Sequence, residues 1–593
     1  MNSNATLASV LAARNLGKRF TPKRLPPVQA LEGVSFEVPR GMLTALVGPD
    51  GAGKTTLMRL AAGLLTPDSG QLQVLGVNVA TDPQQIQDRI SYMPQRFGLY
   101  EDLSVAENLD LYADLHGVSA AERAQRYPRL MEMTALGRFR GRLAGQLSGG
   151  MKQKLGLACT LVRSPELLLL DEPTVGVDPL SRRELWDIVR SLVQEQGISV
   201  LLTTAYLDEA ERCSHVVVLH QGKVLAQGKP AEVTAIASGR VYVAEVPAGQ
   251  GVRRIQSRLL DEPGIIDAVP DGGRVRFVLA PRERGGELAS GSGALSGASV
   301  TPTAARFEDG FMALLRQTAN LEQAAAIALD HPLTAAGDGV VVRVKNLARR
   351  FGSFTAVDHI SFDVHRGTIF GLLGPNGAGK TTTFRMLCGL LSASDGELRV
   401  AGEDVRTARA SARAHLGYVA QKFSLYGALT VLENLEFFAS AYGLRGDRRS
   451  ARIAWAMEQF ELGAHADEPS GQLPGGYKQR LAMAAALLHE PEILFLDEPT
   501  SGADPLARRA FWRRITALAE QGVTIIVTTH FMQEAEYCDR IAIMDAGKVL
   551  AEGAPADIRQ VAESPSGDST MEDAFIAIVE RARKQNGSRE EAA

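Results

Sequence analysis

Two nearly identical stretches decide the fold: GPDGAGKTT at residues 48–56 and GPNGAGKTT at residues 374–382. Each follows an apolar run and precedes a segment with helical periodicity, an order typical of a mainly parallel sheet with helices on its faces. Glycines let backbone N–H groups turn inward around a phosphate, and the following helix presents its positive N-terminus to the anion. The sequence therefore predicts an α/β P-loop NTPase fold that occurs twice.

The lysine of such a loop reaches the β- and γ-phosphates, and the threonine hydroxyl binds Mg²⁺. An ordinary glycine-rich turn is the alternative, but it does not explain two copies. The predicted nucleotide-binding residues are Gly48, Gly51, Gly53, Lys54, Thr55 and Thr56 in the first loop, and Gly374, Asn376, Gly377, Gly379, Lys380, Thr381 and Thr382 in the second.

The repetition extends well beyond the loops. LSGGMKQ begins at Leu147 and LPGGYKQ at Leu473, so their offset of 326 residues (473 − 147) equals that of the loops (374 − 48).

The first copy then contains an extra segment. Its alternating runs at Val241–Val246 and Val275–Leu279 are typical of strands. Its Gly/Ser/Ala tract at Gly285–Ser299 is typical of a flexible loop. We expect a first domain at residues 10–235, an accessory α/β insert with the tail of the first domain at 236–316, a linker at 317–340, a second domain at 341–582 and a flexible tail at 583–593.

Composition excludes several classes of protein. The 593 residues are 45% apolar and 22% charged, which is typical of globular rather than disordered chains. The net charge of −4 argues against a chain that coats nucleic acid or anionic lipid by bulk charge. The densest apolar runs, such as Leu167–Leu170, are far shorter than the roughly 18–20 residues that a membrane-spanning helix needs. No CxxC pair is present, so we expect reduced thiols at Cys159, Cys213, Cys388 and Cys538.

Each copy also contains a hydrophobic run that ends in two carboxylates, Asp171-Glu172 and Asp497-Glu498. In a P-loop NTPase the aspartate binds Mg²⁺, usually through water. The glutamate can polarise the attacking water, a general-base role worth about 10²–10⁴ in rate. A strand that simply ends at a polar turn is the alternative. The predicted catalytic carboxylates are Glu172 and Glu498, and the predicted magnesium ligands are Asp171 and Asp497 with Thr55 and Thr381.

Two glycines stand at a helix start shortly before each carboxylate run, in LSGGMKQKLGLACTL and LPGGYKQRLAMAAAL. Here the sequence resembles the ABC ATPases, over about residues 10–230 and 340–580. The resemblance implies two tandem ABC ATPase domains, each with a helical signature subdomain, that bind ATP and Mg²⁺ and close head to tail, so that the signature of one domain caps the ATP of the other. The signature residues are then Ser148, Gly149, Gly150, Gln153, Pro474, Gly475, Gly476 and Gln479.

The same resemblance assigns roles to further residues. The Q-loop glutamines, placed with the magnesium site, are Gln95 and Gln421, and the D-loop aspartates are Asp178 and Asp504. Phe20 and Phe351 stand where an aromatic ring normally stacks on adenine. Packing in the core and the neighbouring Phe354 remain alternatives to that last assignment.

The switch histidine that this family carries is present in only one copy. The second copy has His530 in VTTHFMQEAE, whereas the first reads LTTAYLDEAE with Ala205 at that place. His215 and His220 lie further on, and we assign them no functional role.

Three departures from the consensus would fall in one composite site of a head-to-tail pair. Ala205 and Asp50 belong to the first copy, and Pro474 replaces the signature serine that the second copy would contribute. Proline offers neither an N–H nor a hydroxyl, alanine cannot bind the γ-phosphate, and Asp50 adds negative charge beside it. Losing one preorganised donor typically costs about 10²–10³ in rate. We therefore expect hydrolysis at the site of Lys380, Glu498, His530 and Ser148–Gly150, and a degenerate site at Lys54, Ala205 and Pro474–Gly476.

QRFGLYEDLSVAENLDLYADLHG, SGGMKQKLGLACTL and THFMQEAEYCDRI resemble the tandem ATP-binding subunits of bacterial ABC-2-type multidrug efflux transporters. The resemblance implies a peripheral protein on the cytoplasmic face of the inner membrane, two integral membrane permease subunits as partners, and no nucleic acid. The apolar, aromatic segments at 96–100 and 422–426 would form a groove for a permease helix, with core packing as the alternative.

A soluble tandem ABC ATPase that acts on ribosomes is the alternative function. Such proteins join their halves by long charged helices, whereas the segment between these copies is rich in Gly, Ser and Ala. A related variant carries a fused membrane domain, which we do not expect here. A nucleotide-binding scaffold without turnover is disfavoured because the second copy retains every expected group.

Overall fold

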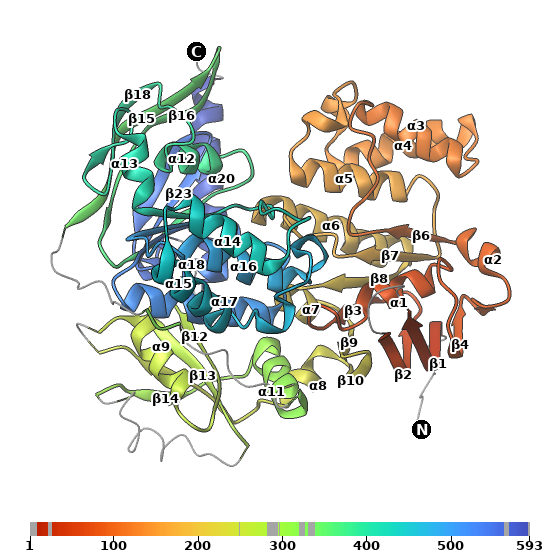
Figure 1. Ribbon diagram of the computed structural model, residues 1–593. Helices are drawn as coiled ribbons and strands as arrows, with labels where there is room; N and C mark the ends of the chain where they lie inside the picture. The colour runs from red at the N-terminus through yellow and green to blue at the C-terminus, as the bar shows by residue number, and fades with distance from the viewer. Residues whose placement is uncertain are drawn as a thin grey trace. The chain divides into compact units, whose positions relative to one another are not determined.

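The computed structural model describes residues 9–21, 27–247, 250–281, 295, 297–319, 327–329, 339–561 and 569–590, which are arranged in two compact units (Figure 1). The first unit comprises Met1–Val241, Pro302–Leu321 and the short segment Asp504–Leu506. The second comprises Tyr242–Thr301, Glu322–Ala503 and Ala507–Ala593.

The first unit is built on a six-stranded sheet with the strand order β10-β9-β3-β8-β7-β6. All neighbours in it are parallel except the edge strand β10. Leu168 and Leu170 of β7 face one hydrophobic core, and Leu167 and Leu169 face another, so the sheet is buried on both sides. The strands are β3 (Leu43–Val47), β6 (Ile90–Met93), β7 (Leu167–Asp171), β8 (Ser199–Thr204), β9 (His215–His220) and β10 (Lys223–Gly228).

An antiparallel sheet and several helices surround this core. The sheet has the order β2-β1-β4-β5, from β1 (Ser9–Phe20), β2 (Val28–Pro39), β4 (Ser69–Val74) and β5 (Val77–Asn78). The helices are α1 (Lys54–Ala61), α2 (Pro83–Gln87), α6 (Pro179–Gln196), α7 (Leu207–Glu211) and α8 (Pro230–Ala235).

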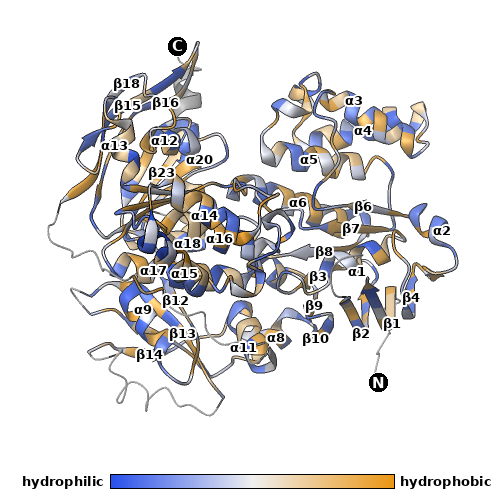
Figure 2. Cartoon of the chain, viewed as in Figure 1, coloured by the Kyte–Doolittle hydropathy of each residue, from blue (hydrophilic) through white to orange (hydrophobic). Residues whose placement is uncertain are grey.

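A helical subdomain lies between β6 and β7 in the chain. It contains α3 (Val105–Leu115), α4 (Ala120–Thr134) and α5 (Gly149–Thr160). Ser104 and Ser119 begin α3 and α4 with capping boxes, which satisfy backbone donors that a helix start leaves free. Apolar and polar residues are interspersed along α3 and α4 (Figure 2), as expected for helices with one buried face, whereas α5 is buried on all sides from Lys154 to Thr160.

The second copy repeats this architecture in the second unit. Its central sheet has the order β20-β21-β22-β17-β23-β24, which matches the first sheet strand for strand, and its outer sheet has the order β16-β15-β18-β19. The central strands are β17 (Ile369–Leu373), β20 (Leu416–Val419), β21 (Ile493–Asp497), β22 (Thr524–Thr529), β23 (Arg540–Asp545) and β24 (Lys548–Gly553), and the outer ones are β15 (Val340–Phe351), β16 (Phe354–His365), β18 (Asp395–Val400) and β19 (Glu403–Asp404).

The helices of the second copy follow the same plan. They are α12 (Lys380–Leu387), α13 (Arg409–Ala414), α14 (Val431–Ala441), α15 (Gly446–Gln459), α16 (Gly475–Leu487), α17 (Pro505–Glu520), α18 (Met532–Ala535), α19 (Pro555–Arg559) and α20 (Met571–Glu590). Helix α20 runs through residues 583–590, where the sequence predicted a flexible tail. The repeat of an α/β domain predicted from the sequence is confirmed.

The accessory segment forms a small sheet of its own with the order β12-β13-β11-β14. Its elements are β11 (Val241–Glu245), α9 (Val252–Asp261), β12 (Ile265–Asp271), β13 (Arg274–Leu279) and β14 (Val300–Pro302), so both predicted strand runs are strands. Residues Tyr242–Thr301, hereafter the accessory subdomain, belong to the second unit, whereas α11 (Phe307–Ala319) belongs to the first and packs on α8. The single region expected at 236–316 is thus divided between two units, because α11 packs on α8 of the first copy whereas the accessory subdomain is bonded to the second copy.

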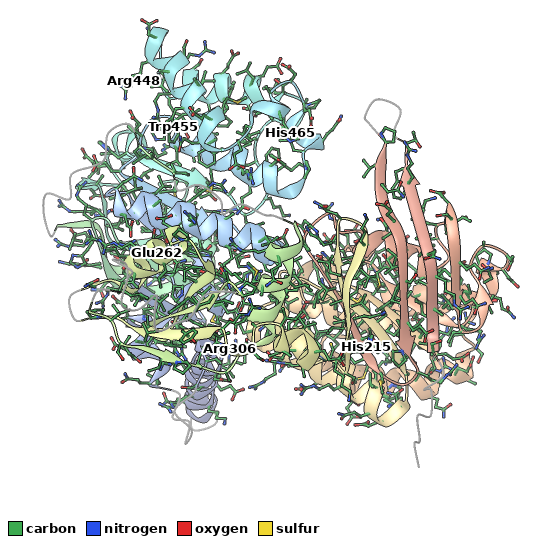
Figure 3. All side chains as sticks on the ribbon, turned by 90° about the horizontal axis from the view of Figure 1, so that it is seen from below. His215, Glu262, Arg306, Arg448, Trp455 and His465 are labelled. Carbon is green, nitrogen blue, oxygen red and sulfur yellow. The ribbon has the colours of Figure 1, made fainter. Side chains whose placement is uncertain are left out.

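Most of the Gly285–Ser299 tract and of the predicted linker at 317–340 lies outside the described residues. The described fragment 327–329 is held on the second copy. Trp455 of α15, labelled in Figure 3, donates its indole N–H to the Ala328 carbonyl at 2.9 Å, and the Leu329 N–H donates to Gln521 Oε1 at 2.6 Å. Among the residues that the structure covers, we find no helix with both the length and the apolarity to cross a membrane.

Candidate functional site

Both predicted phosphate loops have the expected form. Helices α1 and α12 begin at the loop lysines, so their N-termini face the loops. Lys54 Nζ donates to the carbonyls of Gly48 at 2.7 Å and Pro49 at 3.0 Å. Lys380 Nζ makes the equivalent bonds at 2.7 and 3.1 Å. Each lysine therefore lies folded over its own loop, where a phosphate would sit.

The loops close against the outer sheets at a glycine that nothing larger can replace. Gly53 has φ 101°, and a Cβ there would lie 2.5 Å from the Ala30 carbonyl of β2. Gly379 has φ 99°, and a Cβ there would lie 2.6 Å from the Ala356 carbonyl of β16. A left-handed backbone and a close backbone contact both require glycine at these two positions.

The predicted adenine-stacking aromatics lie at the ends of the hairpins that carry these contacts. Phe20 ends β1 and pairs with Val28, two residues before Ala30, and it is 37% exposed. Phe351 ends β15 and pairs with Phe354, two residues before Ala356. Both rings are therefore exposed near their loops, which disfavours the core-packing alternative, but Phe354, at 64%, is more exposed than Phe351, at 45%.

The strand-end aspartates are buried and hydrogen-bonded. Asp171 Oδ1 accepts from Thr203 Oγ1 at 2.7 Å and from Thr55 Oγ1 at 3.4 Å, and Asp497 Oδ1 accepts from Thr528 Oγ1 at 2.6 Å. Carboxylate and hydroxyl oxygens are the ligands that Mg²⁺ prefers, and it is commonly held by one or two protein groups together with substrate phosphates. The described residues contain no group of three or more His, Cys, Asp or Glu that could hold a metal by itself.

The two glutamates each contact a Q-loop glutamine. Gln95 Nε2 donates to Glu172 Oε2 at 2.5 Å, and Gln421 Nε2 donates to Glu498 Oε2 at 2.6 Å. Their backbones are left-handed, with φ 52° at Glu172 and φ 46° at Glu498. A positive φ is uncommon in a non-glycine residue, and it recurs here at the same position of both copies. The sequence placed these glutamines with the magnesium ligands, whereas the structure pairs them with the glutamates.

The surroundings of the two glutamates differ at the switch position. His530 Nδ1 lies 3.3 Å from Glu498 Oε2, and Lys380 Nζ lies 4.0 Å from Glu498 Oε1. The first copy has buried Ala205 at that place, which offers no polar group.

This difference changes the acidity of the two carboxyl groups. Burial raises the pKa of Glu172 to about 7, with the charges of Asp50 and Asp171 adding to the effect against Lys54. Burial also acts to raise the pKa of Glu498, but His530, Lys380 and Gln421 outweigh it, so that pKa lies below its usual value.

The signature helices differ at their first residue. Ser148 caps α5 by accepting from the Met151 N–H at 3.3 Å, whereas Pro474 precedes α16 and makes no side-chain cap. The remaining signature residues, Gly149, Gly150 and Gln153 and their counterparts Gly475, Gly476 and Gln479, lie in the first two turns of these helices. Asp178 caps α6 at Ser181 N, and Asp504 directly precedes α17.

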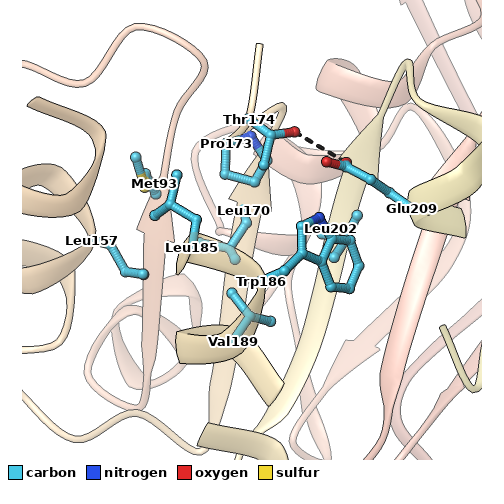
Figure 4. Close-up of a pocket in the computed structure, with 10 residues that line it drawn as sticks. All are labelled: Met93, Leu157, Leu170, Pro173, Thr174, Leu185, Trp186, Val189, Leu202 and Glu209. Atoms are coloured by element: carbon cyan, nitrogen blue, oxygen red, sulfur yellow. Dashed lines mark hydrogen bonds between the residues drawn. The ribbon is translucent and has the colours of Figure 1, made fainter. Parts of the chain in front are cut away.

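Sequence reasoning missed one pair of buried carboxylates. Glu209 accepts from Thr174 Oγ1 at 3.0 Å and from Thr204 Oγ1 at 2.6 Å, beside a small apolar cavity of about 10 Å³ (Figure 4). Glu534 makes the same two contacts in the second copy, with Thr500 and Thr529. Each carboxylate therefore joins the turn that follows the predicted catalytic glutamate to the end of the strand that precedes Ala205 or His530. The Glu-Ala-Glu that occurs in both copies was the available signal.

A groove lies where the helical subdomain meets the sheet core. In the first copy it is a cavity of about 180 Å³ whose wall includes Tyr92, Phe97, Tyr112 and His116. In the second copy Tyr426, Phe437 and Tyr442 are exposed in the same region, and the rings of Tyr426 and Phe437 lie 4.8 Å apart. Within the segments predicted to receive a partner helix, Tyr100 and Tyr426 are exposed, whereas Phe97 packs on the core.

The chain is similar to known ABC transporter ATP-binding proteins. The sequence pattern described as "ABC transporter" matches residues 31–175 and 357–501. The chain is 49% identical over 572 residues, 96% of this chain and 98% of the relative, to the probable multidrug ABC transporter ATP-binding protein YbhF of Escherichia coli K12. It is 42% identical over 223 residues, 37% of this chain and 70% of the relative, to the Nod factor export ATP-binding protein I of Ralstonia nicotianae. A solved structure of the ATP-binding subunit of an ABC transporter is similar at 34% identity and a TM-score of 0.35, over 38% of this chain and 92% of that one.

Proposed function

Because the chain belongs to the ABC transporter family, as one of its ATPases, we propose that it is the motor subunit of an exporter. ATP hydrolysis would drive efflux of drugs or other small molecules through two separate membrane permease subunits, with this chain on the cytoplasmic face of the membrane. The relatives named for multidrug transport and Nod factor export support export as the direction. The observation that carries the catalytic part is the convergence of Lys380, Gln421 and His530 on Glu498.

Each residue of this cluster has a definite task in the proposed hydrolysis. Glu498 accepts a proton from the attacking water as the water oxygen bonds to the γ-phosphorus and the bond to the bridging oxygen breaks, which releases ADP. His530 and Gln421 hold the carboxylate in position, and Lys380 neutralises the γ-phosphate. Asp497 and Thr381 would hold Mg²⁺, which supplies charge neutralisation when bound. The surrounding contacts hold Glu498 in its left-handed backbone conformation, so the base is in position before substrate arrives.

We further propose that the two nucleotide sites are unequal. Ala205 leaves Glu172 without the imidazole that Glu498 has, and Asp50 adds a negative charge to the first loop. Pro474 removes the donors that a signature serine would present to a nucleotide in the same composite site. The first copy then binds ATP and turns it over slowly, and the second copy hydrolyses it.

Steady-state ATP hydrolysis by the full chain tests this assignment. Glu498→Gln removes the base but keeps the shape, so we expect a loss of about 10²–10⁴-fold in kcat. Glu172→Gln is the matched control and should retain at least half of the activity. Equal losses in the two variants would contradict the asymmetry, and no loss in either would contradict the catalytic role of these glutamates.

The exposed aromatic residues of the second copy support a permease as partner. An amphipathic helix binds a groove through apolar anchors, and Tyr426, Phe437 and Tyr442 offer such a surface. Phe437→Ser should lower the fraction of the protein that sediments with membranes in cells that express the permeases. Val561→Ser, at an exposed apolar residue beside α19, is the control that should not. Sedimentation with ribosomes instead would favour the alternative function.

A further inference from the structure

The accessory subdomain follows the first copy in sequence but packs on the segment of the second copy that carries the switch histidine. That segment runs from His530 through α18 to Asp539. We propose that the accessory subdomain is a positioning element for this segment, so that hydrolysis at Glu498 depends on it. The inference rests on the proposed function, because it assumes that Glu498 is the hydrolytic base.

The central contact is a three-way cluster around Arg559. Its guanidinium lies 2.9 Å from Asp271 of β12 and 3.0 Å from Glu536, six residues after His530. The Gly272 N–H donates to the same Glu536 carboxylate at 2.9 Å. The turn between β12 and β13 therefore binds Glu536 both directly and through Arg559. All three charged side chains are at most 16% exposed, so solvent screens the contact weakly.

The turn is shaped for this contact. Gly272 and Gly273 have φ 61° and 80°, the left-handed pair that a tight hairpin turn requires. A Cβ on Gly272 would lie 2.6 Å from Arg559 Nη1, so a side chain there would push the guanidinium away. The glycines thus allow the β12–β13 turn to approach Arg559 closely.

Two further ion pairs hold the accessory subdomain on either side of the segment. Arg509 of α17 donates to Asp267 Oδ2 at 3.1 Å, with both side chains nearly buried, and its guanidinium also contacts the Tyr537 hydroxyl at 3.4 Å. Arg253 of α9 lies 3.3 Å from Asp539 and donates to the Gly367 carbonyl at 3.1 Å. Residues 536, 537 and 539 are therefore all held by the accessory subdomain or by a residue bound to it.

The repeat supplies an internal comparison that makes the contact specific. Aligned by the internal repeat, the first copy has Thr234 in place of Arg559, Asp187 in place of Arg513, and Ser214 in place of Asp539. Arg513 pairs with Asp261 of the accessory subdomain, so an aspartate there would repel it. Arg513, Asp539 and Arg559 are thus particular to the copy that has the switch histidine, whereas Arg183 and Glu211 of the first copy stand in place of Arg509 and Glu536.

The mechanical consequence follows from the short distance along the chain. Glu536 is joined to His530 by one short helix, α18, whose Glu534 is itself fixed by Thr529 at 2.7 Å. Releasing Glu536 frees the far end of this helix and loosens His530 against Glu498. A misplacement of about 1 Å at a catalytic group can lower the rate by about 10²-fold.

The test uses the full chain with Glu172→Gln, so that turnover reports the second copy alone. In that background Asp271→Ala and Arg559→Ala should each lower kcat about tenfold or more, while KM for ATP changes less than twofold. Because the two residues act through one contact, combining them should lower kcat no further than either change alone. Arg559→Lys keeps the positive charge between the two carboxylates and should restore at least half of the lost kcat.

Two controls make the result decisive. Glu245→Ala removes an acidic side chain from β11 that pairs with Arg274 within the accessory subdomain, and it should leave kcat unchanged. Thermal unfolding identifies a variant that has lost its fold. If Asp271→Ala or Arg559→Ala is such a variant, the kcat of the other one tests the inference. Unchanged kcat in both alanine variants, or additive losses, would overturn the inference. If Glu172→Gln alone abolishes turnover, the proposed function is overturned, and the inference falls with it. This outcome is seen before the accessory subdomain is altered.

Discussion

Replacing the switch histidine by alanine tests the chemistry of the second copy most directly. His530 is buried, lies 3.3 Å from Glu498 and stacks on Phe531 with ring centroids 4.6 Å apart, so packing restricts its imidazole. His530→Ala leaves Lys380 and Gln421 in contact with Glu498 but removes one preorganised group. The loss of a single such group costs about 10²–10³ in kcat, which corresponds to about 2.7–4 kcal/mol.

The matched change is Ala205→His in the first copy. Ala205 occupies the equivalent buried position, and Tyr206 offers a ring where Phe531 stands. Measured by phosphate release in the Glu498→Gln background, Ala205→His should raise the residual kcat, while His530→Ala in the wild-type chain should lower kcat about 10²-fold or more. A kcat for His530→Ala within threefold of the wild type would refute the reasoning that this contact orients the catalytic base.

Three further predictions concern stability. Gly379→Ala should destabilise the second copy by more than Gly377→Ala, because both positions have positive φ but only the Gly379 Cβ meets a backbone oxygen; urea unfolding of the two variants measures the difference. Pro474→Ser should stabilise the second copy by about 1 kcal/mol in the same assay, since a serine there can cap α16 as Ser148 caps α5. The third concerns His489, because burial lowers its pKa to about 4. Its Nε2–H donates to the Leu416 carbonyl, and the charged groups nearby are Arg452, Glu490 and His415. The unfolded state takes up a proton at His489 near pH 6.5, whereas the folded state does not. The free energy of unfolding therefore falls as pH drops from 6.5 towards 4, by about 1.4 kcal/mol per pH unit at most. The melting temperature should fall over the same range, and His489→Gln should make its dependence on pH weaker.

The sequence alone was enough for the parts of the site that lie within single local motifs. A phosphate loop, a strand that ends in two carboxylates and a signature helix each depend on the backbone within a few residues, so spacing identifies them without a structure. When the two copies are aligned by the repeat, Ala205 stands at the position equivalent to His530. These assignments needed residue identity and offset, and no knowledge of which distant residues touch.

Contacts between distant residues could not be obtained in this way. The pairing of Gln95 with Glu172, the network around Glu209 and Glu534, and the position of the accessory subdomain join residues that lie far apart in the chain and follow no period. Sequence order suggested that the accessory subdomain belongs with the first copy. Its partner is decided instead by charge complementarity, since Arg509, Arg513 and Arg559 face acidic side chains of β12 and α9. Backbone geometry is local, so local motifs determine the chemistry of this protein. Tertiary packing decides which charged side chains meet, and therefore which copy the accessory subdomain binds.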